Sequence, residues 1–546
     1  MIGFSSGRVR LYSTCALSAW TIAMAVGAMV AGSARAESLA DAIAEAYRSN
    51  PNIQAQRASL RALDESYVQA RSQMGLSASA QAGDSYEELT RGGVGPPFGS
   101  GGKYKAETSN LSLSLQQPIY TGGRVSARAT AAENDIQAGR QNLRRAELDL
   151  LLRVVSSYVG VRRDQQVLEI TRDTVKVLTQ QLEDSRAKFE VRQVTATDVA
   201  QSEARLAQAK TQLANSLAQL AITRSQYLAL VGRNPDQLEP EPALDNLPPT
   251  IEQAFDAAEQ LSPQLLAAQF TEAASRSRVA EARAGRLPTI VLRAERSRGS
   301  VAPYLTKPYD DTVSVQAVLS QPLFSSGQIS SAIRQSLETN NRDRLFIEDA
   351  RRTVVQNVSQ AWEALVAARS SLLSQDVEMR ADETAYYGVR EEERVGLRST
   401  IEVLNAQSEL TQAQLSLVRN RANEYTSRVQ LLALVGALNV DTLSPEAEAY
   451  DPARNFRRVK NRFAMPWEIP LRAFDRLAAP PIGKQRPADT KDAPRTNMIE
   501  DLPPAPPPAA KAAPITSITE IVKRTEGPFD KVDAAAPVTT NRDLGR

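Results

Sequence analysis

The feature that most constrains the fold is a long stretch of sequence that occurs twice. The segment Gln-Pro-Ile-Tyr-Thr-Gly-Gly at residues 117–123 recurs as Gln-Pro-Leu-Phe-Ser-Ser-Gly at residues 321–327, an offset of 322 − 118 = 204 residues. The same offset relates residues 228–232 to residues 432–436, so neither copy gains or loses a residue in between. A register kept over such a length does not arise from similar composition alone. The chain therefore contains two copies of one structural unit.

Each copy begins with two short predicted helices and continues, after a predicted β region, into a long one. The first two helices are expected at residues 39–50 and from Pro51 to about Met74, because a proline ends one helix and can open the next. Their counterparts are residues 251–260 and 263–286. The long runs at residues 124–190 and 328–393 lack proline. At 1.5 Å per residue they predict helices of roughly 100 Å.

A last helix in each copy carries apolar residues every seven positions. In the first copy these are Val199, Leu206, Leu213, Leu220 and Tyr227. Seven-residue spacing is typical of coiled coils with a left-handed supercoil. We therefore expect each chain segment to reverse at residues 190–198 and 394–402 and to fold back along its long helix, with the two shorter helices of a copy stacked end to end beside it.

Between the short helices and the long helix, apolar and polar residues alternate. The apolar positions are Leu76, Ala78, Ala80, Ala82, Leu111, Leu113 and Leu115 in the first copy, and Ile290, Leu292, Ala294, Val313, Val315, Ala317 and Leu319 in the second. A period of two predicts strands, here one hairpin per copy. The helix-breaking prolines upstream are offset by 263 − 51 = 212 residues, so the first copy has 212 − 204 = 8 extra residues. We assign them to a surface loop at residues 91–102.

The two ends of the chain differ from the repeats. Residues 1–36 combine Arg8 and Arg10, an apolar stretch and an Ala-Arg-Ala site, which predicts a signal peptide cleaved after Ala36. Residues 37–245 then form the first repeat and residues 246–445 the second. The proline-rich segment 446–546 is expected to be a largely disordered tail.

The composition argues against catalysis. The chain has no histidine, which excludes a Ser-His-Asp arrangement and histidine metal ligands. Its one cysteine, Cys15, lies in the predicted signal peptide. Removing residues 1–36 takes away three arginines and no acid, so the net charge changes from +2 to 2 − 3 = −1 and suggests no nucleic-acid partner. We expect a protein that is not an enzyme and has no cofactor or metal.

Four strands per chain are too few to close a membrane barrel, since such barrels begin at about eight strands. We therefore expect copies of the chain to share one barrel, two copies giving eight strands and three giving twelve. The long coiled-coil helices would continue its wall beyond the membrane. The predicted fold class is a mixed α and β membrane protein, with antiparallel coiled-coil helices forming an α-barrel next to a shared transmembrane β-barrel.

The duplicated order of elements, the Gln-Pro-x-aromatic-x-x-Gly segments and the turn at residues 395–406 resemble the TolC outer-membrane efflux family over about residues 38–445. The resemblance implies a homotrimer in contact with outer-membrane lipid, with a twelve-stranded β-barrel and a long periplasmic extension. It also implies two kinds of partner: a periplasmic adaptor (membrane fusion) protein, and an inner-membrane ABC exporter or proton-driven pump. The implied function is an exit duct for type I protein secretion or small-molecule efflux.

The resemblance places candidate functional residues at the tip of the long helices. Asp198 and Arg398 match the positions of a periplasmic gate, where an arginine fork against a carboxylate can link neighbouring helices. Alternatively, Asp198 is an acid at a helix N-terminus, stabilised by the helix dipole. Glu402 and Asn405 match a lumen selectivity ring, in which repeated carboxylates favour cations.

Three residues at the tip depart from the family pattern. Arg192 replaces the glycine expected beside the first turn, Glu393 stands where an aromatic gate partner is expected, and Asn405 is uncharged where the family has an acidic ring. The details of gate closure stay open for this reason, as do the cargo and the identity of the inner-membrane partner. The competing hypothesis is a secreted coiled-coil scaffold or adhesin without a pore, whose alternating segments form ordinary small sheets.

Overall fold

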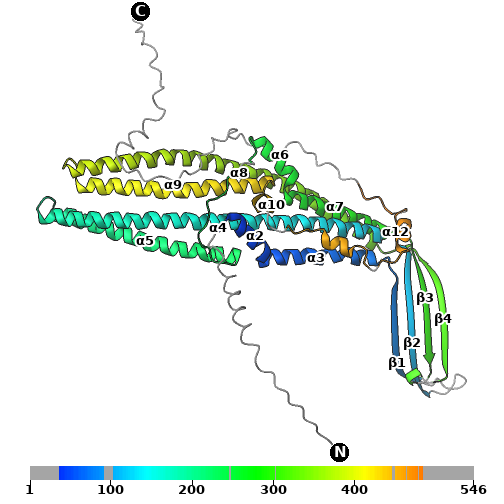
Figure 1. The fold of residues 1–546 in the computed structure, drawn as a ribbon. Coiled ribbons are helices and arrows are strands. Elements are labelled where there is room, and N and C mark those ends of the chain that lie inside the picture. Colours follow the sequence, from blue (N-terminus) through cyan, green and yellow to red (C-terminus); the bar gives the residue numbers. More distant parts are fainter. Residues whose placement is uncertain are drawn as a thin grey trace, which may run out of the picture.

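The protein consists of a long helical body with a four-stranded sheet at one end (Figure 1). The computed structural model describes residues 36–91, 102–244, 247–301, 303–305, 307–444, 449–462, 464–477 and 479–483. The predicted signal peptide up to residue 35, the predicted loop at residues 92–101 and the chain after residue 483 lie outside the described residues.

The two copies have the same order of elements. The first copy comprises α2 (Leu39–Ser49), α3 (Pro51–Ser72), β1 (Ser77–Arg91), β2 (Gly102–Tyr120), α4 (Arg124–Glu190) and α5 (Ala196–Val231). The second comprises α6 (Ile251–Leu261), α7 (Pro263–Ala284), β3 (Thr289–Ser300), β4 (Tyr309–Ser320), α8 (Gln328–Arg394) and α9 (Thr400–Val435). Both long helices have 67 residues and both final helices 36, which confirms the predicted duplication. Of the helices in these ranges, none is long and apolar enough to cross a membrane.

Short helices stack end to end along each long one, as the sequence predicted. In the first copy, α5 packs along the part of α4 that leads to the tip, and α3 along the part nearer the sheet (Figure 1). The two meet where Asn50 Nδ2 donates to the carbonyl of Leu230 at 3.2 Å. The hydroxyl of Ser49 donates to the carbonyl of Val231 at 3.4 Å. These bonds use carbonyls at the end of α5 that have no partner within the helix.

The core lies at the middle of the helical body. Tyr158 in α4 and Trp362 in α8 are both fully buried, and they occupy equivalent positions because 362 − 158 = 204. Apolar residues of α2, α4, α5 and α9 surround Tyr158, and apolar residues of α6, α8 and α9 lie in the cluster that contains Trp362. Burying one large apolar side chain contributes about 1.5–3 kcal/mol. The duplicated aromatic residue therefore gives each copy its own central packing site.

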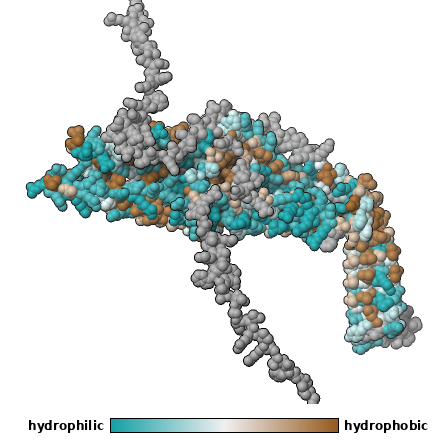
Figure 2. Space-filling view, in the orientation of Figure 1, coloured by the Kyte–Doolittle hydropathy of each residue, from teal (hydrophilic) through white to brown (hydrophobic). Residues whose placement is uncertain are grey.

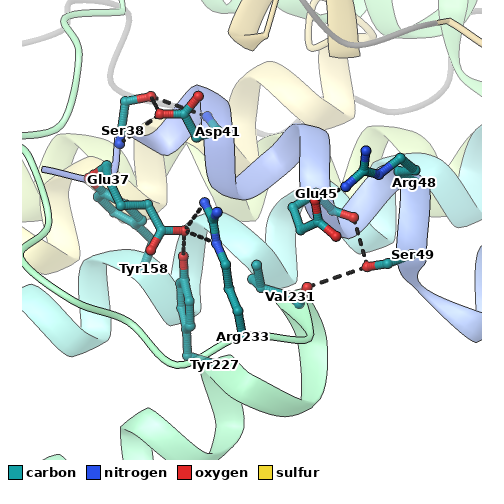
Figure 3. Close-up of polar contacts among 10 residues, drawn as sticks. All are labelled: Glu37, Ser38, Asp41, Glu45, Arg48, Ser49, Tyr158, Tyr227, Val231 and Arg233. Carbon is teal, nitrogen blue, oxygen red and sulfur yellow. Dashed lines mark hydrogen bonds and ion pairs between the residues drawn. The ribbon is translucent and has the colours of Figure 1, made fainter. Parts of the chain in front are cut away.

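Glu37 joins the start of the described chain to the end of the first copy (Figure 3). Its carboxylate oxygen Oε1 accepts hydrogen bonds from the Tyr227 hydroxyl at 2.5 Å and from Arg233 Nη2 at 2.7 Å. Its backbone carbonyl accepts from the Tyr158 hydroxyl at 2.9 Å. Burial raises the pKa of Tyr227, and the hydrogen bond to Glu37 raises it further, so this hydroxyl keeps its proton as a donor. The guanidinium of Arg233 compensates the buried carboxylate.

The sheet has strand order β1-β2-β3-β4, and every pair is antiparallel. Its register places Ala80 opposite Leu113, Leu115 opposite Ala294, and Ala294 opposite Val315. Since opposite residues point to the same side, the alternating apolar residues share one face. Leu113 and Val315 are exposed on that face in the single chain, and hydrophobic side chains run along the sheet in Figure 2.

The beginning of the expected tail differs from the sequence expectation of disorder. After a single turn, α10 (Val440–Leu443), the chain forms α11 (Arg454–Val459) and α12 (Glu468–Leu477). Phe456 packs edge-on against Tyr67 with ring centroids 5.3 Å apart, and Arg71 donates to the carbonyls of Lys460 and Arg462 at 3.0 and 2.8 Å. Proline content hid this segment, because its order comes from contacts of α11 with α3 and of α12 with β2 and α4, and not from local propensity.

Two equivalent glycines provide a test of the packing between helix ends within each copy. Gly232 and Gly436 end α5 and α9 with φ of 89° and 77°, a backbone conformation that costs an L-residue about 1–2 kcal/mol. A Cβ at Gly436 would also lie 2.7 Å from the Cβ of Leu261, whereas a Cβ at Gly232 would lie 3.6 Å from its nearest neighbour, the hydroxyl oxygen of Ser49. We expect Gly436→Ala to lower the thermal unfolding midpoint more than Gly232→Ala does. Equal losses, followed by circular dichroism, would contradict this packing.

Candidate functional site at the helical tip

Both chain reversals at the tip have the same backbone geometry. At the end of α4, the amide of Gln193 donates to the carbonyl of Lys188 at 2.8 Å, and at the end of α8, the amide of Leu397 donates to the carbonyl of Glu392 at 2.8 Å. Arg192 has φ of 60° and its equivalent Gly396 has φ of 80°. The arginine that departs from the family pattern thus adopts the left-handed conformation of the glycine it replaces. The turn is the same in both copies, with strain at Arg192 only.

Asp198 is part of a helix cap. Its Oδ2 accepts from the backbone amide and the hydroxyl of Thr195, both at 2.8 Å, and its own amide donates to the Thr195 hydroxyl at 3.3 Å. This reciprocal arrangement is a capping box, which satisfies two amides at the start of α5. Within the single chain, the contacts of Asp198 are those of an acid at a helix N-terminus, which was the alternative expectation for this residue.

Glu402 occupies the equivalent position in the second copy, since 402 − 198 = 204, and the structure brings it together with Arg398. Its Oε2 accepts from the backbone amide and hydroxyl of Ser399 at 2.8 Å, and its Oε1 accepts from Arg398 Nη1 at 2.9 Å. Arg398 also pairs through Nε with Glu392 at 2.8 Å. The hydrogen bonds from Ser399, followed by the one from Arg398, lower the pKa of Glu402 to about 2. Glu402 is therefore an anion at every physiological pH.

The structure does not bring the two predicted gate residues together. In the described part of this one chain, Arg398 forms ion pairs with Glu392 and Glu402, while Asp198 accepts hydrogen bonds from Thr195. The equivalent of Arg398 in the first copy is Val194, because 398 − 194 = 204. A cation at this position of the turn is thus present in the second copy only. A bond between Asp198 and Arg398 stays a prediction for neighbouring chains.

Two polar contacts join the coiled coils of the two copies near the tip. Asn405 accepts a hydrogen bond from Arg205 Nη2 at 3.1 Å, which links α9 to α5. Lys188 Nζ lies 2.6 Å from Glu393 Oε1, which links the last turns of α4 and α8. Sequence reasoning noted Glu393 only as a departure from the family pattern and missed Lys188. The available signal was their opposite charge, each within two residues of the end of a long helix.

Apolar contacts support these polar ones on both sides. Leu404 of α9 packs into a cluster with Leu178 and Leu182 of α4 and Leu206 of α5. On the second copy, Tyr386 is buried against Val403 and its neighbours, and this burial raises the pKa of Tyr386. The tip thus contains two small apolar clusters beneath charged pairs, while Val191, Val395 and Leu397 in the turns are exposed. In the described residues, no group of three or more acidic, histidine or cysteine side chains could hold a metal ion.

A helical wall of roughly 100 Å, attached to an apolar sheet and ending in charged turns, defines a channel protein. The chain belongs to the outer membrane efflux protein family, whose model matches residues 42–233 and 254–437. It is 29% identical to the outer membrane efflux protein BepC of Brucella suis over 84% of this chain and 98% of BepC. It is 24% identical to the alkaline protease secretion protein AprF of Pseudomonas aeruginosa over 66% of this chain and 76% of AprF.

A solved structure agrees with the same fold. The crystal structure of the CmeC outer membrane channel of Campylobacter jejuni matches with a TM-score of 0.66 and 14% identity, over 79% of this chain and 90% of CmeC. The predicted TolC-like family is thereby confirmed, together with an outer-membrane location and a periplasmic tunnel. The protein is an exit duct of the outer membrane.

The lowered pKa of Glu402 predicts how the tip responds to acid. Because the pKa is below that of the unfolded chain, the stabilisation from this carboxylate is complete above about pH 4.5 and is lost as the pH falls towards about 2. We expect Glu402→Gln to speed amide exchange in the turn at residues 395–402 by a constant factor from about pH 8 to about pH 5, and by less below that. Hydrogen-exchange mass spectrometry measures this, with the exposed Glu409→Gln as control. A difference already gone at about pH 6 would contradict the contacts described.

Proposed function

We propose that three copies of the chain assemble around one axis. Their 3 × 4 = 12 strands would close a barrel across the outer membrane, and their helices would form the periplasmic tunnel. The observation that carries this proposal is the sheet. In the described residues, β1 and β4 each pair on one side only, although they are 15 and 12 residues long. Long unpaired edges in a membrane require partners, and neighbouring copies supply them.

Apolar side chains on the second copy support the same assembly. Leu323 and Phe324, just after β4, are 93% and 88% exposed in the single chain. Leu345 and Phe346 in α8 are 70% and 55% exposed. A patch of this kind on both the sheet end and the helix marks a surface that another protein or lipid covers. A neighbouring copy adjoining β4 and α8 would cover it.

The tip would act as the gate of this tunnel. The contacts between Lys188 and Glu393 and between Arg205 and Asn405 tie the coil α8–α9 to the coil α4–α5. Partly exposed pairs such as these are individually weak. In a trimer, Arg398 could exchange Glu392 for Asp198 of a neighbouring chain and add links between chains. The gate would then open when a partner protein binds the conformation with separated coiled coils more tightly than the conformation with joined coiled coils.

Glu402 and Asn405 would line the narrow end of the tunnel. Three copies of an anionic Glu402 near one axis favour cations, while Asn405 adds hydrogen-bonding capacity without charge. The contacts of Asn405 with Arg205 and of Glu402 with Arg398 moderate this field, because each brings a cation to the ring. The ring would therefore give a moderate cation preference and not a strict filter.

The duct itself would be a passive conduit without catalysis or cofactor. Partner proteins would supply the energy for transport. These are a periplasmic adaptor and an inner-membrane ABC exporter or proton-driven pump. The names of the relatives cover both uses, since BepC is an efflux protein and AprF serves the secretion of an alkaline protease. Type I protein secretion and small-molecule efflux both fit a wide tunnel of this length. The scaffold or adhesin alternative leaves the exposed apolar face of the sheet without a partner.

Removing the Arg398 side chain tests the gate. We expect Arg398→Ala to increase single-channel conductance in planar lipid bilayers severalfold, because the variant cannot link to Asp198 of a neighbouring chain, and because Glu392 and Glu402 repel each other without the cation that bridges them. The matched control is Arg394→Ala, which removes an arginine four residues earlier that forms an ion pair with Glu391 of its own helix. Conductance unchanged in Arg398→Ala, or raised equally in both variants, would show that Arg398 is only a surface cation.

A further inference from the structure

Helix α12 is attached to the protein by its polar side. Asp475 is fully buried, and its Oδ1 accepts hydrogen bonds from the backbone amides of Thr121 at 2.7 Å and Gly123 at 3.1 Å. The Thr121 hydroxyl donates to the same oxygen at 3.0 Å. These amides lie at the N-terminus of α4, where free donors and the helix dipole favour an anion. Glu468, seven residues before Asp475 and so on the same side of α12, is also buried.

The opposite side of α12 is apolar and faces outward. Ile469, Ala473 and Leu477 follow one another at intervals of four residues, so they share a face, with Pro470 and Phe474 beside them. Ile469 is 65% exposed and Leu477 is 84% exposed. A helix on the surface of a soluble protein buries its apolar stripe and exposes its polar one. In α12 this arrangement is reversed.

The location of α12 indicates what covers this face. The helix lies where the sheet joins the helical body (Figure 1), and Phe474 packs edge-on against Tyr120 at the end of β2, with centroids 5.8 Å apart. The indole nitrogen of Trp467 donates to Gln117 Oε1 at 3.3 Å. The hydrophobic colouring of the sheet continues up to this junction in Figure 2. The outward face of α12 is thus continuous with the apolar face of the sheet.

Charge distinguishes a lipid surface from a protein partner. Arg476 is exposed next to the apolar face, and the half-buried Arg472 lies one turn earlier on the same side, where its Nε donates to the carbonyl of Glu468 at 3.4 Å. Both acidic residues of the helix, Glu468 and Asp475, are turned inward. Apolar residues bordered by arginines and a tryptophan, without exposed acids, are the pattern of helices that lie in a membrane interface and meet lipid phosphates.

We propose that α12 is an interfacial helix that rests on the periplasmic leaflet of the outer membrane. Ile469, Phe474 and Leu477 enter the boundary of the acyl chains, and Arg476 meets lipid phosphates. Asp475 fixes the helix to the start of α4, so the membrane contact sets the height of the helical body relative to the bilayer. The inference rests on the proposed function only in that the sheet spans the membrane.

Single cysteines labelled with an environment-sensitive fluorophore test this contact. The mature chain would carry no other cysteine to label, because Cys15, the one cysteine of the sequence, precedes the predicted cleavage site. The full mature chain carrying Leu477→Cys is labelled and reconstituted in vesicles of phosphatidylcholine and phosphatidylglycerol with brominated acyl chains. We expect a blue-shifted emission and strong quenching relative to unbrominated vesicles. Adding Asp475→Ala, which frees the helix from α4, should reduce both effects, whereas adding Arg394→Ala should change neither.

Two further labels separate the possible outcomes. Val313→Cys, on the apolar face of β4, reports whether the sheet is in the membrane, and Leu397→Cys, 75% exposed at the tip, reports the aqueous signal. Quenching at Val313 but not at Leu477 would overturn the interfacial helix and leave the duct intact. Absence of quenching at Val313 would contradict the membrane-spanning sheet and, with it, the inference. A disulfide between Leu477→Cys and Phe324→Cys of a second copy would show that a neighbouring chain covers this face instead.

Discussion

The equal length of α4 and α8 is the constraint on which the rest of the structure depends. Both helices start after a glycine with positive φ at the end of the sheet and run for 67 residues. One extra residue in either helix would shift its tip by 1.5 Å and rotate it by about 100°. Lys188 would then turn away from Glu393, and Leu404 would leave its cluster. The duplication without insertion keeps the two tips level, so that a few polar links can join them.

Within this nearly symmetric frame, the copies differ where function would need it. The caps Thr195–Asp198 and Ser399–Glu402 are equivalent, yet the position directly before the cap holds Arg398 in the second copy and Val194 in the first. At the other end, α12 covers the start of α4, while the corresponding end of β4 leaves Phe324 exposed. One copy is thus completed by the chain's own C-terminal segment. The other leaves the equivalent surface exposed in the single chain.

The sequence predicted the fold better than the contacts of the site. A constant offset and the positions of prolines such as Pro51 and Pro263 placed the helices within a few residues, because these signals are local or periodic. The pairings at the tip depend on which helices lie side by side, so Lys188 was missed and Arg398 was matched to Asp198 through a family position. Helix α12 was missed for a similar reason: Asp475 is an ordinary acid in the sequence and becomes a docking group only beside the amides of Thr121 and Gly123.

The number of chains in one particle tests the central claim most directly. The protein is extracted in mild detergent from the outer-membrane fraction, and its mass is measured by light scattering corrected for detergent. Three chains per particle are predicted, because three sheets of four strands close one barrel and cover the edges of β1 and β4. A single chain per particle, or a protein recovered from the soluble periplasmic fraction, would contradict the shared duct.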